Sequence, residues 1–188
     1  MRTPLRHLVS SLALAVAVVT GAPFLRAGPA ITVTSPETLP IKHDRPWVFL
    51  GGTIDMGASV DWQTGLARKL GDLDVVFLNP RRNDWSPAWR PVATDTHFVQ
   101  QVRWELAALE AADVVVMYLA PNSQSPVSLM ELGLHARSGK LIVLCPEGFW
   151  RKGNVDLTAA FYGVEQVSSM DELEAVVRRR VAARRAQS

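Results

Sequence analysis

The stretch ADVVVMYLAPNSQSPVSLMELG, residues 112–133, indicates the fold class most clearly. Asp113–Leu119 is a short apolar run rich in valine, which predicts a buried strand. Ala120–Pro126 is a polar loop, and Val127–Arg137 has the apolar spacing of a helix. A strand, a polar loop and a helix in this order form one unit of an α/β fold.

The same unit recurs on both sides of this stretch. The other predicted strands are Trp47–Leu50, Asp74–Leu78, Lys140–Leu144 and Gly163–Val167. The other predicted helices are Asp61–Leu70, His97–Ala112, Ala159–Tyr162 and Met170–Arg180. Continuous apolar strands that alternate with amphipathic helices predict a three-layer α/β fold, in which helices cover both faces of a parallel sheet of about five strands.

A parallel sheet of this kind binds its ligands at the carboxyl ends of its strands. Four loops follow these ends in the predicted sheet, and we expect the functional site among them. They are Gly51–Ser59, Asn79–Asp95, Ala120–Ser128 and Pro146–Asn154.

The composition predicts one folded domain without a metal site. The chain has 188 residues, of which 48% are hydrophobic and 20% charged, and this balance argues against a disordered chain. The single cysteine, Cys145, excludes an intramolecular disulfide framework and a multi-cysteine zinc site, and it is expected in the core. None of the four histidines lies four residues from another, so we expect no metal and no cofactor.

The positive charge lies at the two ends of the chain. The net charge is +2, but eight arginines fall within residues 1–30 and 178–188, and neither segment holds an acid. Residues 31–177 hold 12 Lys and Arg against all 18 Asp and Glu, which is a poor surface for a nucleic-acid polymer. The C-terminal arginines either stabilise the end of a helix or form an interaction tail.

The first thirty residues have the layout of a secretory signal peptide. Met1–His7 is basic, Leu8–Val19 is apolar but short for a membrane span, and small residues follow. An uncleaved anchor, a disordered extension and a start assigned too far upstream are the alternatives. A signal peptide implies an exported or periplasmic protein, and its absence a cytoplasmic one. Residues 31–45 predict a linker or an extended lead-in strand, and 46–188 the domain.

The loop after the first domain strand begins with two glycines. Gly51 and Gly52 would let a ligand approach the backbone, although the loop matches neither a dinucleotide fingerprint nor a P-loop. Asp55 lies near the strand end, where it could take a hydrogen bond from a ligand. Asp61 predicts the N-cap of the next helix, and Trp62 lies either in the core or against a ligand.

The next loop contributes two arginines. Asn79 and the proline after it end the strand by turn chemistry. Arg81 and Arg82 either bind a phosphate or carboxylate, or are simply solvated. Asp84 could instead pair with one of them.

Two later helices carry candidate acids. Gln101 and Glu105 lie four residues apart and share one helix face, with Trp104 beside them. Glu131 lies among leucines and a methionine in the helix that follows the polar loop. It is therefore either a surface residue on the outer face or a buried residue with a function.

These motifs resemble the nucleoside 2-deoxyribosyltransferase-like superfamily, in its divergent branch with NPRR and Q-x-x-W-E. The matching pieces are FLGGTID and DW within 49–62, NPRR at 79–82, QVRWE at 101–105, ADVVV at 112–116 and SPVSLMELG at 125–133. The resemblance implies a flavodoxin-like, Rossmann-like sheet and the cleavage or transfer of N-glycosidic bonds in a (deoxy)nucleoside or nucleotide.

The resemblance also implies roles for the candidate residues. Glu131 would be the nucleophile that forms a covalent glycosyl-enzyme, and Asp55 and Glu105 would assist the departing base, helped by Gln101. Where the family usually has an acid, six residues before the nucleophile, this chain has Ser125. The implied substrate-binding set is Gly51, Gly52, Thr53, Trp62, Asn79, Arg81, Arg82, Gln101, Ser125 and Ser128.

Other functions stay open at this stage. A non-catalytic nucleoside-binding module and an NAD-type nucleotide glycohydrolase fit the same fold. The resemblance implies a small-molecule substrate and a homo-oligomer, and no membrane contact beyond the N-terminal leader.

Overall fold

The computed structural model describes residues 28–187, so the predicted signal peptide lies almost wholly outside the described residues. The strands are β1 (Ile31–Thr34), β2 (Trp47–Gly52), β3 (Val76–Asn79), β4 (Val114–Tyr118), β5 (Leu141–Leu144) and β6 (Glu165–Val167). The helices are α1 (Trp62–Lys69), α2 (Thr96–Ala111), α3 (Pro126–His135), α4 (Lys152–Tyr162) and α5 (Met170–Arg185), with a 3₁₀ turn η1 (Asp55–Gly57). No helix among residues 28–187 is long and apolar enough to cross a membrane.

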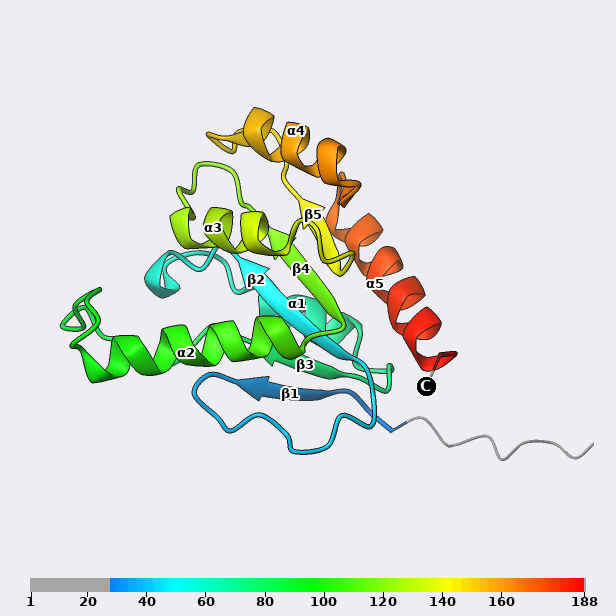
Figure 1. Cartoon of the computed structure of the whole chain (residues 1–188), viewed down its shortest axis with the longest axis horizontal. Helices are drawn as coiled ribbons and strands as arrows, with labels where there is room; N and C mark the ends of the chain where they lie inside the picture. Colours follow the sequence, from blue (N-terminus) through cyan, green and yellow to red (C-terminus); the bar gives the residue numbers. More distant parts are fainter. Residues whose placement is uncertain (1–27, 188) are drawn as a thin grey trace, which may run out of the picture.

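All six strands are parallel and lie in the order β1-β3-β2-β4-β5-β6 (Figure 1). Without β1, this order is that of a flavodoxin-like sheet, which confirms the predicted α/β fold. The chain runs from β2 outward to β3 and then crosses over β2 to β4. The strand order therefore reverses between β2 and β4, and open α/β sheets bind their ligands beyond the carboxyl ends of the strands at such a reversal.

Strand β1 makes the sheet one strand wider than predicted. It pairs with β3 in parallel, with Ile31 opposite Val76 and Thr34 opposite Asn79. The lead-in strand is therefore the correct alternative for residues 31–34. The sequence signal is weak because β1 is an edge strand: Ile31 is half-exposed, and prolines follow closely.

The core consists of two layers, one on each face of the sheet. One layer joins Phe49, Val115 and Val143 to apolar side chains of α2, α3 and α4. The other joins the alternate strand residues, among them Leu50 and Val116, to α1 and α5. Helices thus cover both faces, and side chains that alternate along each strand supply both cores.

The C-terminal arginines belong to α5. Arg178 bonds both carboxylate oxygens of Asp72, at 2.9 and 2.8 Å. Arg180 bonds Glu165, and Arg185 lies 3.0 Å from Asp74. Three of these arginines therefore hold the helix against the rest of the domain, which favours the structural alternative over an interaction tail.

Candidate active site

A cluster of hydroxyl groups lies just beyond the carboxyl ends of β2 and β4. The Oγ1 atom of Thr53 lies 2.9 Å from Ser123 Oγ and 2.8 Å from Ser125 Oγ, and it accepts a bond from the backbone N–H of Ala120. Ser125 stands at the start of α3 with a left-handed backbone, φ +42°. Thr53 and Ser125, both in the predicted set, therefore lie together at the reversal point of the sheet.

The lack of a side chain at Gly52 makes room for the backbone of the neighbouring strand β4. A Cβ atom at this position would lie 2.1 Å from the carbonyl oxygen of Tyr118 on β4, and the residue has φ +128°. A Cβ on Gly51 would meet the side chains of Phe49 and Met117 instead, at 2.9 and 3.2 Å. The close approach of β4 is therefore sufficient reason for a glycine at position 52, whether or not a ligand also approaches its backbone.

Trp62 belongs to the core. Its ring packs edge-on against Tyr118 with centroids 5.4 Å apart, and its Nε1–H donates to the carbonyl oxygen of Thr53 at 2.9 Å. The preceding Asp61 accepts a bond from the backbone N–H of Thr64, as predicted for an N-cap. Of the two alternatives for Trp62, the structure supports the core.

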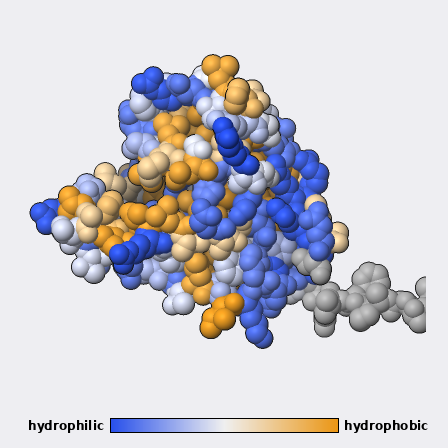
Figure 2. Space-filling model, viewed as in Figure 1, coloured by the Kyte–Doolittle hydropathy of each residue, from blue (hydrophilic) through white to orange (hydrophobic). Residues whose placement is uncertain are grey.

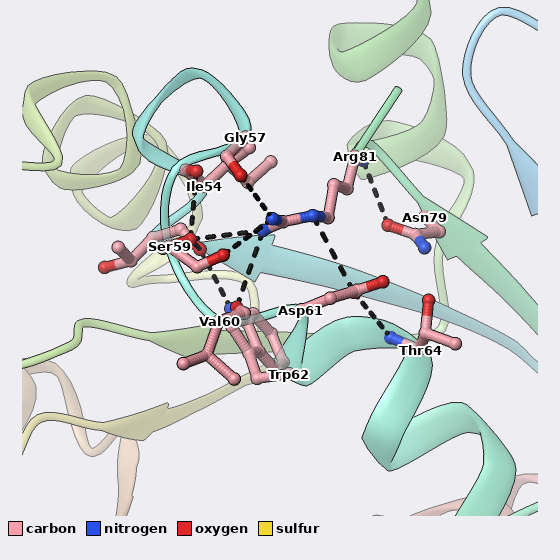
Figure 3. A network of polar contacts seen from close by, with 10 residues as sticks. Ile54, Gly57, Ser59, Val60, Asp61, Trp62, Thr64, Asn79 and Arg81 are labelled. Carbon is pink, nitrogen blue, oxygen red and sulfur yellow. Dashed lines mark hydrogen bonds and ion pairs between the residues drawn. The ribbon is translucent and has the colours of Figure 1, made fainter. Parts of the chain in front are cut away.

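Arg81 fastens the loop between β2 and α1, as Figure 3 shows. Its guanidinium donates to the carbonyl oxygens of Gly57 and Ser59 at 2.8 and 2.7 Å, and to Ser59 Oγ at 3.1 Å. The amide oxygen of Asn79 accepts from the backbone N–H of Arg81 and so fixes the turn after β3. The donors of Arg81 point at the protein's own oxygens, not at a vacant anion site.

Arg82 also has partners within the protein. It forms a two-point pair with Asp84, with both N–O distances at 2.8 Å, and its guanidinium lies 4.5 Å from the ring centroid of Trp89. The residue is 7% exposed. The structure therefore supports the pairing alternative that the sequence left open for Asp84.

Glu131 lies on the buried face of α3. Ser128, Leu132 and His135 share this face, and Glu131 is 6% exposed. Removal from water raises the pKa of its carboxyl to about 8, and the negative charge of Glu105 contributes to the increase. No hydrogen bond to the Glu131 carboxylate is found within residues 28–187.

Glu105 is the second carboxyl of the site. It is partly buried on α2, and desolvation raises its pKa to about 6, while a hydrogen bond from Gln101 opposes that increase. The donor is Nε2 of Gln101, at 2.9 Å from Glu105 Oε1. The predicted shared face of Gln101 and Glu105 is thus an actual contact.

Asp55 does not join this pair. It is exposed in η1 with φ +48°, and no hydrogen bond or ion pair links it to Glu105 or Glu131 in the described chain. Of the predicted acids, the structure therefore brings together Glu105 and Glu131 only. Burial raises the pKa of both carboxyls, and it raises that of Glu131 further than that of Glu105.

Ser35 is a site residue that the sequence did not indicate. Its hydroxyl is buried and donates to Oε1 of Gln101 at 2.6 Å. Two residues later, the carbonyl oxygen of Glu37 accepts from Nε1 of Trp104 at 2.7 Å. Both residues fall in the segment with few sequence signals, 31–45, so only the parallel pairing of β1 with β3 reveals their position.

Other reactive groups do not form a competing site. Within residues 28–187 no group of three or more His, Cys, Asp or Glu is arranged to hold a metal ion. Cys145 lies in the core, as predicted, and burial raises the pKa of its thiol to about 11. A thiol that stays protonated in this way is a poor nucleophile.

The burial of Glu131 predicts a pH-dependent effect on stability. Because the folded-state pKa of Glu131 is raised from 4.5 to about 8, its contribution is fully favourable below about pH 4.5 and is lost as the pH rises to about 8. Glu131→Gln removes this loss, so we expect the variant to melt on the order of 5 to 10 °C above the native protein at pH 9. At pH 4 the two should melt together. Calorimetry at both pH values measures this, and equal melting at pH 9 would show that Glu131 is solvated.

Comparisons with known proteins give the family and the fold of the chain. The model of the family described as "Nucleoside 2-deoxyribosyltransferase like" matches residues 45–149. A crystal structure of a conserved protein from Enterococcus faecalis V583 is similar in fold, with a TM-score of 0.53 and 14% sequence identity, and covers 72% of this chain and 99% of that chain. No curated protein matches the chain. The family match spans Glu105, Glu131 and the loops around them, and the chain belongs to the nucleoside 2-deoxyribosyltransferase-like family.

Proposed function

We propose that the protein breaks the N-glycosidic bond of a nucleoside through a covalent glycosyl-Glu131 intermediate. The observation that carries the proposal is the pair of Glu131, buried on α3, and Glu105, partly buried on α2, which is close enough to raise the pKa of Glu131. A retaining glycosidase uses two carboxyls, one as the nucleophile and the other to transfer protons. Their surroundings give the two carboxyls different pKa values.

In the first step the ionised Glu131 attacks C1′ of the sugar. The C1′–N bond breaks, its electron pair goes to the base, and the proton held by Glu105 passes to a nitrogen of the base. In the second step Glu105 accepts a proton from water, the water oxygen attacks C1′, and Glu131 leaves as a carboxylate. A second base in place of water gives the transferase.

The proton must move within the pair before the first step. In the free protein it resides mainly on Glu131, the carboxyl with the higher pKa. The positive charge that develops on the sugar favours the ionised form of Glu131 and leaves the proton on Glu105. The reactive arrangement thus needs one proton in the pair, not two or none.

The reaction is therefore expected to have a bell-shaped pH profile. Below about pH 6 both carboxyls are protonated and the nucleophile is neutral, while above about pH 8 both are ionised and the base receives no proton. We expect kcat/KM for base release from a panel of deoxynucleosides, nucleotides and NAD to fall on both sides of pH 7. The proposal fails if no member of the panel loses its base.

The arginines favour a nucleoside over a 5′-phosphorylated substrate. Arg81 and Arg82 would be the phosphate ligands, but both already bind oxygens of the protein. Ser128 is buried one turn before Glu131 on the same face of α3, and we propose that it binds a sugar hydroxyl. Release of nicotinamide from NAD would support the glycohydrolase alternative, and binding without release the binding module.

The outer face of α3 supports the proposal of a homo-oligomer. Val127, Met130 and Leu134 are 53, 58 and 62% exposed and lie together on the outward side of α3. Figure 2 shows hydrophobic residues gathered on the side of the molecule that carries α2, α3 and α4. A second copy of the chain would cover this face. A monomer by sedimentation at micromolar concentration would contradict the proposal.

A further inference from the structure

The segment before the family match reaches directly into the carboxyl site. The match begins at residue 45, whereas Ser35 lies ten residues earlier at the end of β1. Its backbone N–H donates to the carbonyl oxygen of Asn79 at 3.0 Å, which fixes the residue beside β3. From there its hydroxyl donates to Gln101, and the residue is 3% exposed.

The side-chain amide of Gln101 has only one orientation that satisfies its neighbours. Its Nε2 atom lies 2.9 Å from the carbonyl oxygen of Pro80, which can only accept a hydrogen bond. The same nitrogen lies 2.9 Å from Glu105 Oε1, and the hydroxyl of Ser35 lies at the opposite end, 2.6 Å from Oε1. Both N–H groups of the amide are therefore used, one of them on Glu105.

This N–H favours the ionised form of Glu105. A donor aimed at a partly buried carboxylate offsets some of the free energy that desolvation costs. The resulting negative charge on Glu105 is what Glu131 experiences from the facing helix. The hydroxyl of Ser35 thus acts on the ionisation of Glu105, and through it on that of Glu131, by way of the Gln101 amide.

The charged groups on the surrounding elements have other partners or lie apart. On α3, burial lowers the pKa of His135, and the charges that act on this residue are those of Glu110 and Lys140. In the loop after β3, Arg82 is paired with Asp84, and Arg81 with backbone carbonyls. Asp55 in the loop after β2 is exposed.

We propose that Ser35 is a positioning residue that fixes the amide of Gln101 toward Glu105 and thereby favours the ionised form of Glu105 and the proton on Glu131. The role rests on the proposed function of that pair. It makes the N-terminal strand, which the family match does not include, part of the site.

The test measures the two carboxyls in the free, full-length protein, without substrate. Carboxyl carbons of ¹³C-labelled glutamate are followed by NMR from pH 4 to 10 in the native protein and in Ser35→Ala. Without the hydroxyl, the Gln101 amide can turn away from Glu105. We expect the pKa of Glu105 to rise by about 0.5 or more and that of Glu131 to fall, so that the two values converge.

Two controls separate positioning from a general structural effect. Ser35→Thr keeps the hydroxyl and should retain native pKa values, whereas Ser35→Val, whose side chain has the shape of threonine without the hydroxyl, should behave like Ser35→Ala. Ser168→Ala removes a hydroxyl that bonds Glu172 and should change neither carboxyl of the pair. Ser35→Val set against Ser35→Thr also keeps the test valid if Ser35→Ala folds poorly.

Unchanged pKa values of Glu105 and Glu131 in both Ser35→Ala and Ser35→Val would overturn the inference. Because the titration needs no turnover, its outcome is independent of base release. Converging pKa values in a protein that releases no base would leave the positioning role standing and remove the proposed reaction.

Discussion

Replacing Glu131 with glutamine is expected to lower base release by at least ~10³-fold, because glutamine cannot form the glycosyl ester that carries the reaction. The amide has nearly the shape of the carboxyl and fits the same buried face of α3. The protein should therefore fold. It should also be more stable than the native protein at high pH, because glutamine has no charge to bury. The measurement is the initial rate of base release at pH 7 on the best substrate of the panel.

The matched control for this variant is Glu147→Gln. This variant makes the same chemical change, but at a side chain that is 92% exposed. We expect its rate to stay within about twofold of the native rate, as is usual for exposed positions away from a site. If Glu131→Gln retained a rate like that of Glu147→Gln, the nucleophile would have to be another residue.

Replacing Gly52 with alanine is expected to have the largest effect on stability, a loss of more than ~4 kcal/mol. The added Cβ would lie 2.1 Å from Tyr118 O and 2.7 Å from Tyr118 N, both of them backbone atoms of β4 that cannot move aside. The backbone at Gly52 also has φ +128°, which L-residues with side chains rarely adopt. Urea denaturation measures the loss, and failure to obtain folded protein is its extreme form.

Gly65→Ala is the control, since nothing lies within 4 Å of a Cβ built at this exposed position in α1. Alanine has a better helix propensity than glycine, so this variant should gain about 0.5 to 1 kcal/mol. A Gly52→Ala protein with the native urea midpoint would show that β2 and β4 do not approach as closely as described.

The sequence predicts the sheet well because the central strands are buried on both faces. Runs such as VVVMY and LIVL show no alternation of polar and apolar residues. Such runs, separated by helices, are typical of a parallel sheet. The same reasoning does not predict the edge strand β1. Its four residues are half-exposed at one end, and only the pairing with β3 makes them a strand.

The burial of Glu131 could only be left open from the sequence. Apolar residues occur on both sides of it in the chain, but in the structure Met130 and Leu134 face outward while Leu132 faces the core. An α3 with apolar side chains on both faces gives no periodicity that tells inside from outside. The packing of α3 against the sheet is what places Glu131 inside.

The roles of Arg81 and Gly52 depend on contacts between distant segments. The carbonyl oxygens that bind Arg81 belong to residues more than twenty positions earlier in the chain, and the backbone that crowds Gly52 belongs to the strand after α2. No local pattern reports such contacts. By contrast, Gln101 and Glu105 are one helical turn apart, and their contact was predictable.

A covalent bond between Glu131 and the sugar can be detected directly by mass spectrometry of the full chain. The protein is incubated with a panel of 2′-deoxy-2′-fluoroarabinosyl nucleosides, whose fluorine slows hydrolysis of the intermediate by destabilising positive charge on the sugar. We expect a mass increase of one fluorosugar on the peptide that contains Glu131, and none in Glu131→Gln. An adduct on another peptide, or base release from the panel by native protein and Glu131→Gln alike, would contradict it.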